Sequence, residues 1–238
     1  MLIEQYRQRW SEKHALRAIY ADLHRRMIAA SIEGPSLEIG GGIGNFCTNK
    51  GSLVRMDVQR SHDVDLVADA HWLPFADGAF SNIYLFDVLH HLQCPLRFIW
   101  EAERVLQTGG RVVMIEPGVT PFSNIIYEMG HEEPVDLSWV PGDDCVPDPG
   151  KDPYASNQAI PTILFQRSPH FFDNAGSSLR IVRTQWLSLF AYPLSGGFKP
   201  WSLLPLWLVS PLLRLEEVLL PVLGRLMAFR LMVVMEKQ

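Results

Sequence analysis

The feature that most constrains the fold is a regular alternation along residues 36–117. Short runs rich in branched and aromatic residues, each of strand length, are separated by polar turns. These runs are residues 36–39, 53–57, 64–69, 79–87 and 111–115. A helix is predicted over residues 95–106, which begin with proline and are followed by two glycines. Strands that alternate with helices predict an α/β fold whose sheet is doubly wound and mainly parallel.

Acidic residues close four of these runs. Asp57, Asp69, Asp87 and Glu116 each stand at or directly after the end of a predicted strand. In an open parallel sheet the carboxyl ends of the strands meet at one edge, and ligands bind along that edge. The four carboxylates are therefore predicted to share a ligand-binding edge.

A glycine-rich turn follows the first run, where residues 38–44 read EIGGGIG. Glycines allow positive φ and a close approach to a ligand, and we expect a short helix after the turn whose N-terminus attracts anions. A dinucleotide site needs a third glycine at the position of Asn45, and the Gly-Lys-Ser/Thr of a P-loop is absent. Asp57 is placed to accept ribose hydroxyls and Asp69 an adenine amine, so the pattern indicates an adenosyl ligand without a pyrophosphate.

The remaining segments are predicted to be parts of one domain. Residues 4–31 have the apolar spacing of a single amphipathic helix. Late strands are expected at residues 185–192 and 228–235, around an apolar helical segment of residues 201–223. The expected parts are an N-terminal helix (1–33), a cofactor-binding core (34–117), an inserted cap (118–178) and a C-terminal part (179–238).

Charge is distributed unevenly along the chain. The formal net charge is -5, which argues against nucleic acid as a partner. From residue 179 onward, however, seven basic residues stand against three acidic ones, in a segment that is strongly apolar. Three interpretations stay open for residues 201–223: a buried hydrophobic lid with ordinary surface arginines, contact with a membrane surface or lipid, and a homodimer interface.

The cysteines and the N-terminus bear on localisation. Cys47, Cys94 and Cys145 are far apart and fit neither a metal-binding motif nor a disulfide framework, which predicts reduced thiols. The N-terminus lacks the apolar core of a signal peptide, and the most apolar stretch is shorter than the roughly 20 residues that span a bilayer. We therefore expect a cytoplasmic protein that can lie peripherally on a membrane.

Taken together, these segments resemble a known family, the class I S-adenosylmethionine-dependent methyltransferases of the type 11 group. The matching segments are LEIGGGIG (37–44), MD (56–57), ADAHWLPF (68–75), FDVLHHL (86–92), ERVL (103–106) and GGR (109–111). The resemblance spans residues 37–117. It implies a Rossmann-like methyltransferase fold with a seven-stranded sheet, S-adenosyl-L-methionine as cofactor and S-adenosyl-L-homocysteine as product.

The resemblance also implies roles for individual residues. Glu38 and the backbone of Gly40, Gly41, Gly42 and Gly44 would hold the methionine end of the cofactor. The nucleoside end would be held by Asp57 at the ribose, Val58 against the adenine, Asp69 at the adenine amine and Ala70 beside it. Phe86 and Asp87 would border the sulfonium.

Histidines are the candidate bases, because imidazole accepts protons near neutral pH. His90 and His91 follow the fourth strand, and at most one of the two is expected to face the site; His131 lies in the cap. No metal is expected. The predicted acceptor is a small metabolite, hydrophobic or linked to a lipid or glycan, methylated at oxygen, with nitrogen and carbon left open. The alternatives are a non-catalytic S-adenosylmethionine-binding module and a nicotinamide-dependent oxidoreductase.

Overall fold

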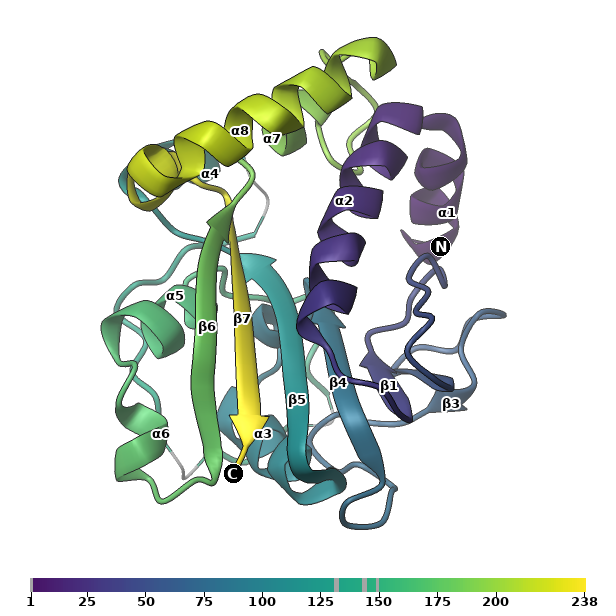
Figure 1. Ribbon diagram of the computed structural model, residues 1–238, viewed down its shortest axis with the longest axis vertical. Helices are drawn as coiled ribbons and strands as arrows, with labels where there is room; N and C mark the ends of the chain where they lie inside the picture. The colour runs from purple at the N-terminus through teal and green to yellow at the C-terminus, as the bar shows by residue number, and fades with distance from the viewer. Residues whose placement is uncertain (1, 131–132, 143–144, 149) are drawn as a thin grey trace.

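The computed structural model describes residues 2–130, 133–142, 145–148 and 150–238. Its strands form a seven-stranded sheet in the order β3-β2-β1-β4-β5-β7-β6 (Figure 1). The strands are β1 (Ser36–Ile39), β2 (Leu53–Asp57), β3 (Leu66–Val67), β4 (Phe80–Phe86), β5 (Leu106–Pro117), β6 (Leu179–Leu187) and β7 (Arg230–Lys237). Strands β1 to β5 pair in parallel, and β7 runs antiparallel to both β5 and β6. The predicted doubly wound, mainly parallel α/β fold is confirmed.

Helices cover both faces of this sheet. They are α1 (Leu2–Glu12), α2 (His14–Ala30), α3 (Pro95–Val105), α4 (Pro121–Gly130), α5 (Ile160–Thr162), α6 (Phe171–Asn174), α7 (Ala191–Ser195) and α8 (Leu206–Met227). Two further turns are the 3-10 helix η1 (Leu89–His91) and the π-helix η2 (Ile163–Arg167). Apolar side chains of α3, α5, η2 and α6 pack on one face, and those of α2, α7 and α8 pack on the other.

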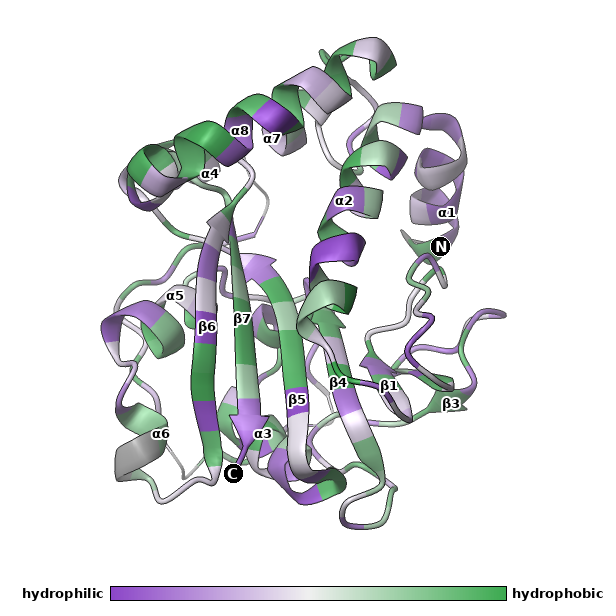
Figure 2. Cartoon of the chain, in the orientation of Figure 1, coloured by the Kyte–Doolittle hydropathy of each residue, from purple (hydrophilic) through white to green (hydrophobic). Residues whose placement is uncertain are grey.

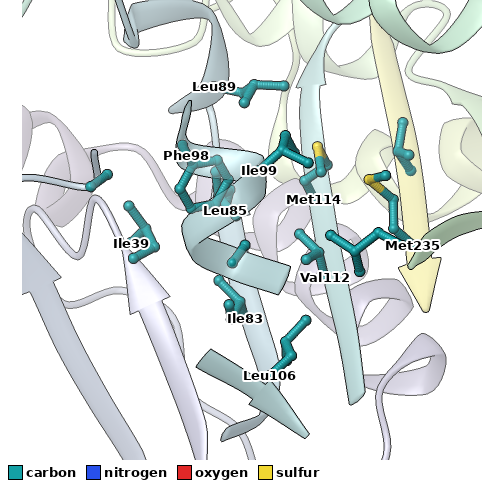
Figure 3. Close-up of a cluster of buried hydrophobic side chains, with 14 of the residues drawn as sticks. Ile39, Ile83, Leu85, Leu89, Phe98, Ile99, Leu106, Val112, Met114 and Met235 are labelled. Atoms are coloured by element: carbon teal, nitrogen blue, oxygen red, sulfur yellow. The ribbon is translucent and has the colours of Figure 1, made fainter. Parts of the chain in front are cut away.

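The central strands are apolar along most of their length because both of their faces are covered (Figure 2). Successive side chains of a strand point to opposite faces, so Ile83 and Leu85 join the core beneath α3 while Tyr84 joins the core beneath α2. Phe98 and Ile99 of α3 complete the first of these cores (Figure 3). All five side chains are at most 1% exposed, so the core fixes the positions at which the strands end.

The N-terminal segment differs from the expected single helix over residues 4–31. It forms two helices, α1 and α2, which are separated at Lys13. The ammonium group of Lys13 donates hydrogen bonds to the carbonyl oxygens of Ser195, Lys199 and Trp201 at 2.7, 2.9 and 2.8 Å. The amphipathic period does not reveal this break, because the contacts that hold it come from the loop before α8, far along the chain.

The expected helix after the glycine-rich turn is also wrong. Residues 40–52 form turns and bends, and Phe46 from this segment is buried against α2. The idea that a helix N-terminus at this turn attracts an anion therefore does not hold.

The lengths of several other predicted elements change in the structure. The third strand, predicted over residues 64–69, is reduced to Leu66–Val67, and the strand predicted at 185–192 begins at Leu179 instead. The apolar helix predicted over residues 201–223 runs over Leu206–Met227. No helix among the described residues has the length and apolarity that crossing a membrane would require.

Cysteine pairing is a further correction. Cys94 and Cys145 form a disulfide, whereas Cys47 is free and exposed. The bond joins the residue directly before α3 to the cap, so two segments 51 residues apart in sequence are covalently tied. The prediction of reduced thiols is wrong for this pair, because spacing in the sequence says nothing of proximity in the fold. A cytoplasmic location stays a prediction that no longer draws support from these thiols.

Candidate active site

The glycine-rich turn leaves the end of β1 and bends back toward β2. Gly40, Gly42 and Gly44 have φ values of +73°, +47° and +66°, which side chains other than glycine rarely adopt. A Cβ atom at Gly40 would come within 2.3 Å of Val88 Cγ2, and one at Gly44 within 2.6 Å of the Asp63 Cβ. The turn therefore requires glycine for its conformation at three positions and for space at two of them.

Asp57 fastens this turn to the end of β2. Its Oδ2 atom accepts a hydrogen bond from the backbone N–H of Gly42 at 3.0 Å, and Oδ1 accepts one from Gln59 at 2.8 Å. A carboxylate oxygen can accept more than one hydrogen bond, so both atoms keep capacity for a ligand hydroxyl. Val58, the next residue, is 54% exposed and offers an apolar surface beside the carboxylate.

Glu38 carries an unsatisfied buried group at the same edge. Its Oε2 atom lies 3.3 Å from Nε of Arg55, yet neither atom makes a hydrogen bond. Burial raises the pKa of Glu38 to about 8, in opposition to the nearby charge of Arg55. A buried carboxyl oxygen without a hydrogen-bond donor is costly, so the position suits a cationic donor such as an α-ammonium group.

Asp69 follows the short strand β3 and orients a buried histidine. His71 Nδ1 lies 2.6 Å from Asp69 Oδ1, and His71 Nε2 accepts a hydrogen bond from the backbone N–H of Cys94 at 3.2 Å. Because Nε2 is an acceptor, the ring proton is on Nδ1 and is donated to Asp69. The carboxylate is 43% exposed, and Ala70 beside it is buried.

Asp87 directly follows β4 and adopts a left-handed conformation, with φ of +56°. Its two carboxylate oxygens receive hydrogen bonds from the guanidinium of Arg230 at 2.5 and 2.8 Å. Arg230 opens β7, is 2% exposed and stacks over the rings of Tyr192 and Phe86, at 4.0 and 4.9 Å from their centroids. The sheet thus neutralises Asp87 with a buried cation, which the sequence analysis did not anticipate.

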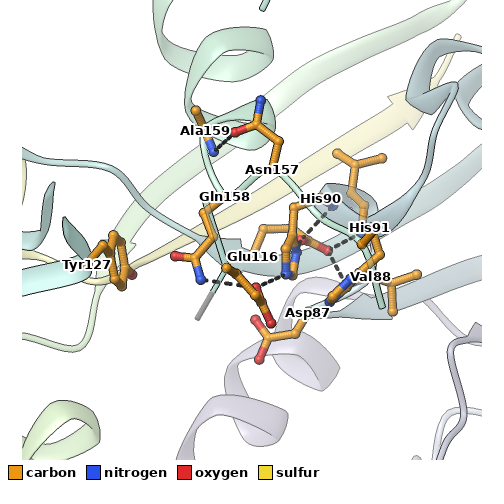
Figure 4. Close-up of polar contacts among 12 residues, drawn as sticks. Asp87, Val88, His90, His91, Glu116, Tyr127, Asn157, Gln158 and Ala159 are labelled. Atoms are coloured by element: carbon orange, nitrogen blue, oxygen red, sulfur yellow. Dashed lines mark hydrogen bonds and ion pairs between the residues drawn. The ribbon is translucent and has the colours of Figure 1, made fainter. Parts of the chain in front are cut away.

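His90 is held between two carboxylates (Figure 4). Its Nδ1 lies 2.7 Å from Oε2 of Glu116, at the end of β5, and its Nε2 lies 3.3 Å from Oε2 of Glu133, in the cap. Glu116 is fully buried and also accepts the backbone N–H groups of Val88 and Leu89, at 2.9 and 2.8 Å. Burial lowers the pKa of His90, but the bonds to Glu116 and Glu133 outweigh it and raise that pKa to about 9. His90 is therefore an imidazolium that joins the cap to the sheet.

We call the cluster of Glu116, His90 and Glu133 the clamp. His91 lies directly beside it and has a different environment. The two imidazole rings are 4.1 Å apart between centroids, and Nδ1 of His91 is buried without a hydrogen-bond partner. Burial, followed by the positive charge of His90, lowers the pKa of His91, so its ring is neutral near pH 7. The structure brings His90 and His91 to the sheet edge as predicted, whereas the third candidate, His131, lies outside the described residues.

A family comparison bears directly on these residues. The family model described as "Methyltransferase domain" of the type 11 group matches residues 37–114, which contain β1 to β4, the glycine-rich turn and both histidines. Residues 37–114 are a methyltransferase domain of the type 11 group of class I S-adenosylmethionine-dependent methyltransferases. S-adenosylmethionine is therefore the cofactor of this domain, and the resemblance stated from sequence is confirmed.

Solved structures show that the methyltransferase fold extends beyond the matched segment. An S-adenosylmethionine-dependent methyltransferase from Archaeoglobus fulgidus is 14% identical, with 93% of this chain and 94% of that chain covered at a TM-score of 0.53. Geranyl diphosphate C-methyltransferase from Streptomyces coelicolor, solved with Mg²⁺, geranyl diphosphate and S-adenosyl-L-homocysteine, is 13% identical; 98% and 83% of the two chains are covered at a TM-score of 0.51. At these identities the likeness establishes the fold alone.

A curated relative matches over a short segment. An uncharacterized 37.1 kDa protein in a transposon of Streptomyces fradiae is 43% identical over 51 residues. That match covers 21% of this chain and 15% of the relative. The acceptor and partners of the methyltransferase, and the activity of the whole protein, are accordingly matters of proposal.

The residues at the β1–β2 edge fit the cofactor of this family. Glu38 Oε2 has no hydrogen-bond donor and is suited to accept one from the ammonium group of a methionyl tail. The three glycines with positive φ have no side chain that would keep this tail from the backbone. Asp57 has the remaining acceptor capacity that a ribose diol needs. The β1–β2 edge thus offers groups suited to the ammonium group and the ribose of the cofactor.

Several residues that shape the site were not singled out from the sequence. Arg230 is one, and a lone arginine at the start of the apolar run 230–235 was the available signal, because a buried charge requires a partner. Glu133 is another, since its partner His90 is 43 residues away along the chain. Glu116 was predicted at the sheet edge, but its hydrogen bonds to the turn after β4 were not.

Two cavities of about 380 and 480 Å³ lie elsewhere. The first is lined by α3, the turn before β6 and the end of β7, including Trp100, Ser177 and Lys237. The second lies along α1 and α2 and is bounded by Asn45 and Leu206. Neither is lined by Asp57, Asp87 or His91, so the assignment of the methyltransferase site depends on contacts at the strand ends.

Proposed function

We propose that this methyltransferase transfers the methyl group of S-adenosylmethionine to an oxygen of a small hydrophobic acceptor, one that is free or linked to a lipid or glycan. The observation that carries the proposal is the neutral, unpaired Nδ1 of His91 at the same strand-end edge as the glycine-rich turn. A neutral imidazole is the group that a hydroxyl acceptor needs, because that hydroxyl loses a proton during transfer.

The cofactor would lie across the ends of β1, β2 and β4. In this arrangement the methionine end is held by Glu38 and by the turn formed by Gly40, Gly41, Gly42 and Gly44. Asp57 accepts the ribose hydroxyls, Val58 covers the adenine, and Asp69 and Ala70 border its amine. Phe86 and Asp87 border the sulfonium in this arrangement. The contacts of Asp57 with the turn and the incomplete bonding of Glu38 support this arrangement.

The proposed reaction is an in-line displacement. His91 Nδ1 accepts the acceptor's hydroxyl proton, the oxygen forms a bond to the methyl carbon, and the carbon–sulfur bond breaks. Its electron pair returns to sulfur and leaves S-adenosyl-L-homocysteine as a neutral thioether. His90 cannot take the same role, because both of its ring nitrogens face carboxylates and it already carries the proton. Its proposed part is to position η1 and to keep His91 neutral.

The hydrophobic character of the acceptor follows from what surrounds this edge. Helices α4 and α8 lie beyond the end of β5 and are apolar over much of their surface (Figure 2). Peripheral contact between residues 201–223 and lipid belongs to the same proposal, as does a cytoplasmic location. A homodimer through this segment is the competing arrangement.

The proposal is tested by incubating the purified protein with methyl-labelled S-adenosylmethionine and fractionated small-molecule and lipid extracts. Label should appear in an organic-soluble product. Its release from that product by alkaline hydrolysis of a methyl ester, or by acid cleavage of a methyl ether, would support an oxygen acceptor. Label on nitrogen or carbon would overturn the choice of atom. Tight cofactor binding with no transfer to any fraction would favour a non-catalytic cofactor-binding module instead.

A further inference from the structure

Two helices at the strand-end edge present apolar side chains to solvent. On α4 these are Phe122, Ile125, Ile126 and Met129, with exposures of 39, 53, 39 and 79%. On α8 they are Trp207, Leu215, Val218, Val222 and Leu226, with exposures of 76, 49, 73, 75 and 53%. The two helices pack against each other (Figure 1). We call these nine side chains the α4–α8 face, and so large a set of exposed apolar groups marks an interaction surface.

The spacing on each helix places these side chains on a single stripe. The α4 residues recur at intervals of three, one and three, and the α8 residues at intervals of eight, three, four and four, all of which keep to one side of a helix. The stripe on α8 is about 28 Å long at ~1.5 Å per residue. An elongated stripe with a tryptophan near one end has the form of a helix that lies flat in the interfacial layer of a bilayer.

The exposed charges on α8 are biased toward positive. Arg214 and Arg225 are exposed. Of the two acids on this helix, Glu216 is buried and accepts the backbone N–H groups of Phe190 and Ala191, and Glu217 is paired with Arg26. The guanidinium groups of Arg214 and Arg225 therefore flank the stripe without an acid on α8 to balance them, which complements anionic headgroups.

The same charges disfavour a second copy as the occupant. In a two-fold dimer through this face, both copies would bring Arg214 and Arg225 to one interface, so four guanidinium groups would share it. Like charges brought together at an interface oppose association. A membrane rich in anionic lipid gains from those charges instead.

The face also lies close to the reaction edge. Helix α4 begins four residues after β5 ends and finishes three residues before Glu133, so it connects the two carboxylates that hold His90. Helix α8 is fixed to the body by the hydrogen bonds that Glu216 accepts from Phe190 and Ala191 at the start of α7. A surface bound to this face would therefore lie next to the cluster of Glu116, His90 and Glu133.

We propose that the α4–α8 face docks the protein on an anionic lipid bilayer, with α8 lying along the surface. This inference rests on the lipid contact proposed above and deepens it, but it concerns binding alone and not the methyl transfer. It is measured without cofactor or acceptor, so its failure and that of the proposed function are distinguishable.

The test is co-flotation of the full chain with two kinds of vesicle, phosphatidylcholine alone and a mixture of phosphatidylcholine with phosphatidylglycerol. We expect binding to the mixed vesicles and weak binding to the neutral ones. Val218→Glu should lower the partition coefficient by about tenfold or more, because an apolar contact is replaced by a charge. Arg214→Gln and Arg225→Gln should each lower binding to mixed vesicles about fivefold and leave binding to neutral vesicles unchanged.

Val182→Glu on the edge strand β6 is the matched control, since Val182 is also exposed, at 49%. It should bind the mixed vesicles as the parent does. The proposal is overturned if the parent binds neither vesicle, or if Val182→Glu and Val218→Glu reduce binding equally. It is also overturned if light scattering shows a dimer that Val218→Glu dissociates, because a second copy is then the occupant.

Discussion

The two halves of the strand-end edge differ in how completely their polar groups are satisfied. At the β1–β2 half, Glu38 keeps a buried oxygen without a hydrogen bond, and Asp57 touches only backbone amides. At the β4–β5 half, Glu116 accepts the backbone N–H groups of Val88 and Leu89 and binds His90, which in turn reaches the cap. The β1–β2 half, which we call the open half, has hydrogen-bonding groups that a ligand can satisfy. In the β4–β5 half, which we call the closed half, Glu116 and His90 are bonded within the protein, and His91 keeps an unpaired Nδ1. Changes to the first should therefore alter binding, and changes to the second should alter stability or turnover.

The largest expected effect comes from replacing His91, whose Nδ1 is unpaired in the closed half. His91→Gln should lower the methyl-transfer rate by roughly 10²–10⁴-fold, the contribution of a positioned general base, and leave the affinity for S-adenosyl-L-homocysteine unchanged. Initial rates with the identified acceptor and calorimetric titration measure the two quantities. A rate that stays within threefold of the parent's would remove His91 from the mechanism.

Glu116→Gln tests whether the closed half is a structural clamp. Removing the charge that faces a buried imidazolium should lower the free energy of unfolding by about 3–5 kcal/mol. Glu128→Gln is the matched control, because Glu128 is an exposed carboxylate bonded to Asn124 on α4 and should cost little. Denaturant melts of the two variants that coincide would contradict the clamp.

The clamp should also depend on pH in a defined direction. The pKa of His90 is raised from 6.5 to about 9, so its stabilising contribution is full below pH 6.5 and is lost as pH rises through 9. The pKa of Glu133 is lowered from 4.5 to about 2, so its contribution is full above pH 4.5 and is lost only as pH falls toward 2. Hydrogen exchange at the cap, corrected for intrinsic rates, should accelerate between pH 6.5 and 9. A flat profile in the parent, or the same profile in His90→Asn, would argue against this linkage.

The smallest expected effect is the release of a proton from Glu38, in the open half, when the cofactor binds. Because the pKa of Glu38 is raised to about 8, most of its carboxyl groups are protonated at pH 7, and an ammonium group placed beside it would drive the proton off. Cofactor binding at pH 7 should therefore release a fraction of a proton, which calorimetry in buffers of different ionisation enthalpy detects. Glu38→Gln should abolish that release. Equal release by both proteins would assign the proton elsewhere.

The sequence was informative wherever the cause of a structure is local. The alternation of apolar runs predicted β1, β2, β4 and β5, and the proline and glycines around residues 95–106 predicted α3 almost to the residue. The glycine-rich turn was located because its backbone requirement is met by residues next to one another. Asp57 was placed beside it because parallel neighbouring strands bring their carboxyl ends to one edge.

The failures have long-range causes. The break at Lys13 is held by carbonyls from residues 195–201, and the disulfide joins residues 51 positions apart. The ion pair of Asp87 with Arg230 crosses from β4 to β7, which no pattern in either segment indicates. His90 and His91 were equal candidates in the sequence, and only their partners in the fold distinguish a clamp from a free imidazole.

The central claim is that the β1–β2 edge, with its glycine-rich turn and Asp57, binds the adenosyl cofactor. Calorimetric titration of S-adenosyl-L-homocysteine into Asp57→Ala tests it most directly, with Asp77→Ala, a change to an exposed aspartate paired with Arg104, as control. The account predicts that Asp57→Ala loses about 1–3 kcal/mol of binding free energy while the control binds as the parent does. A folded Asp57→Ala protein with parental affinity would contradict it.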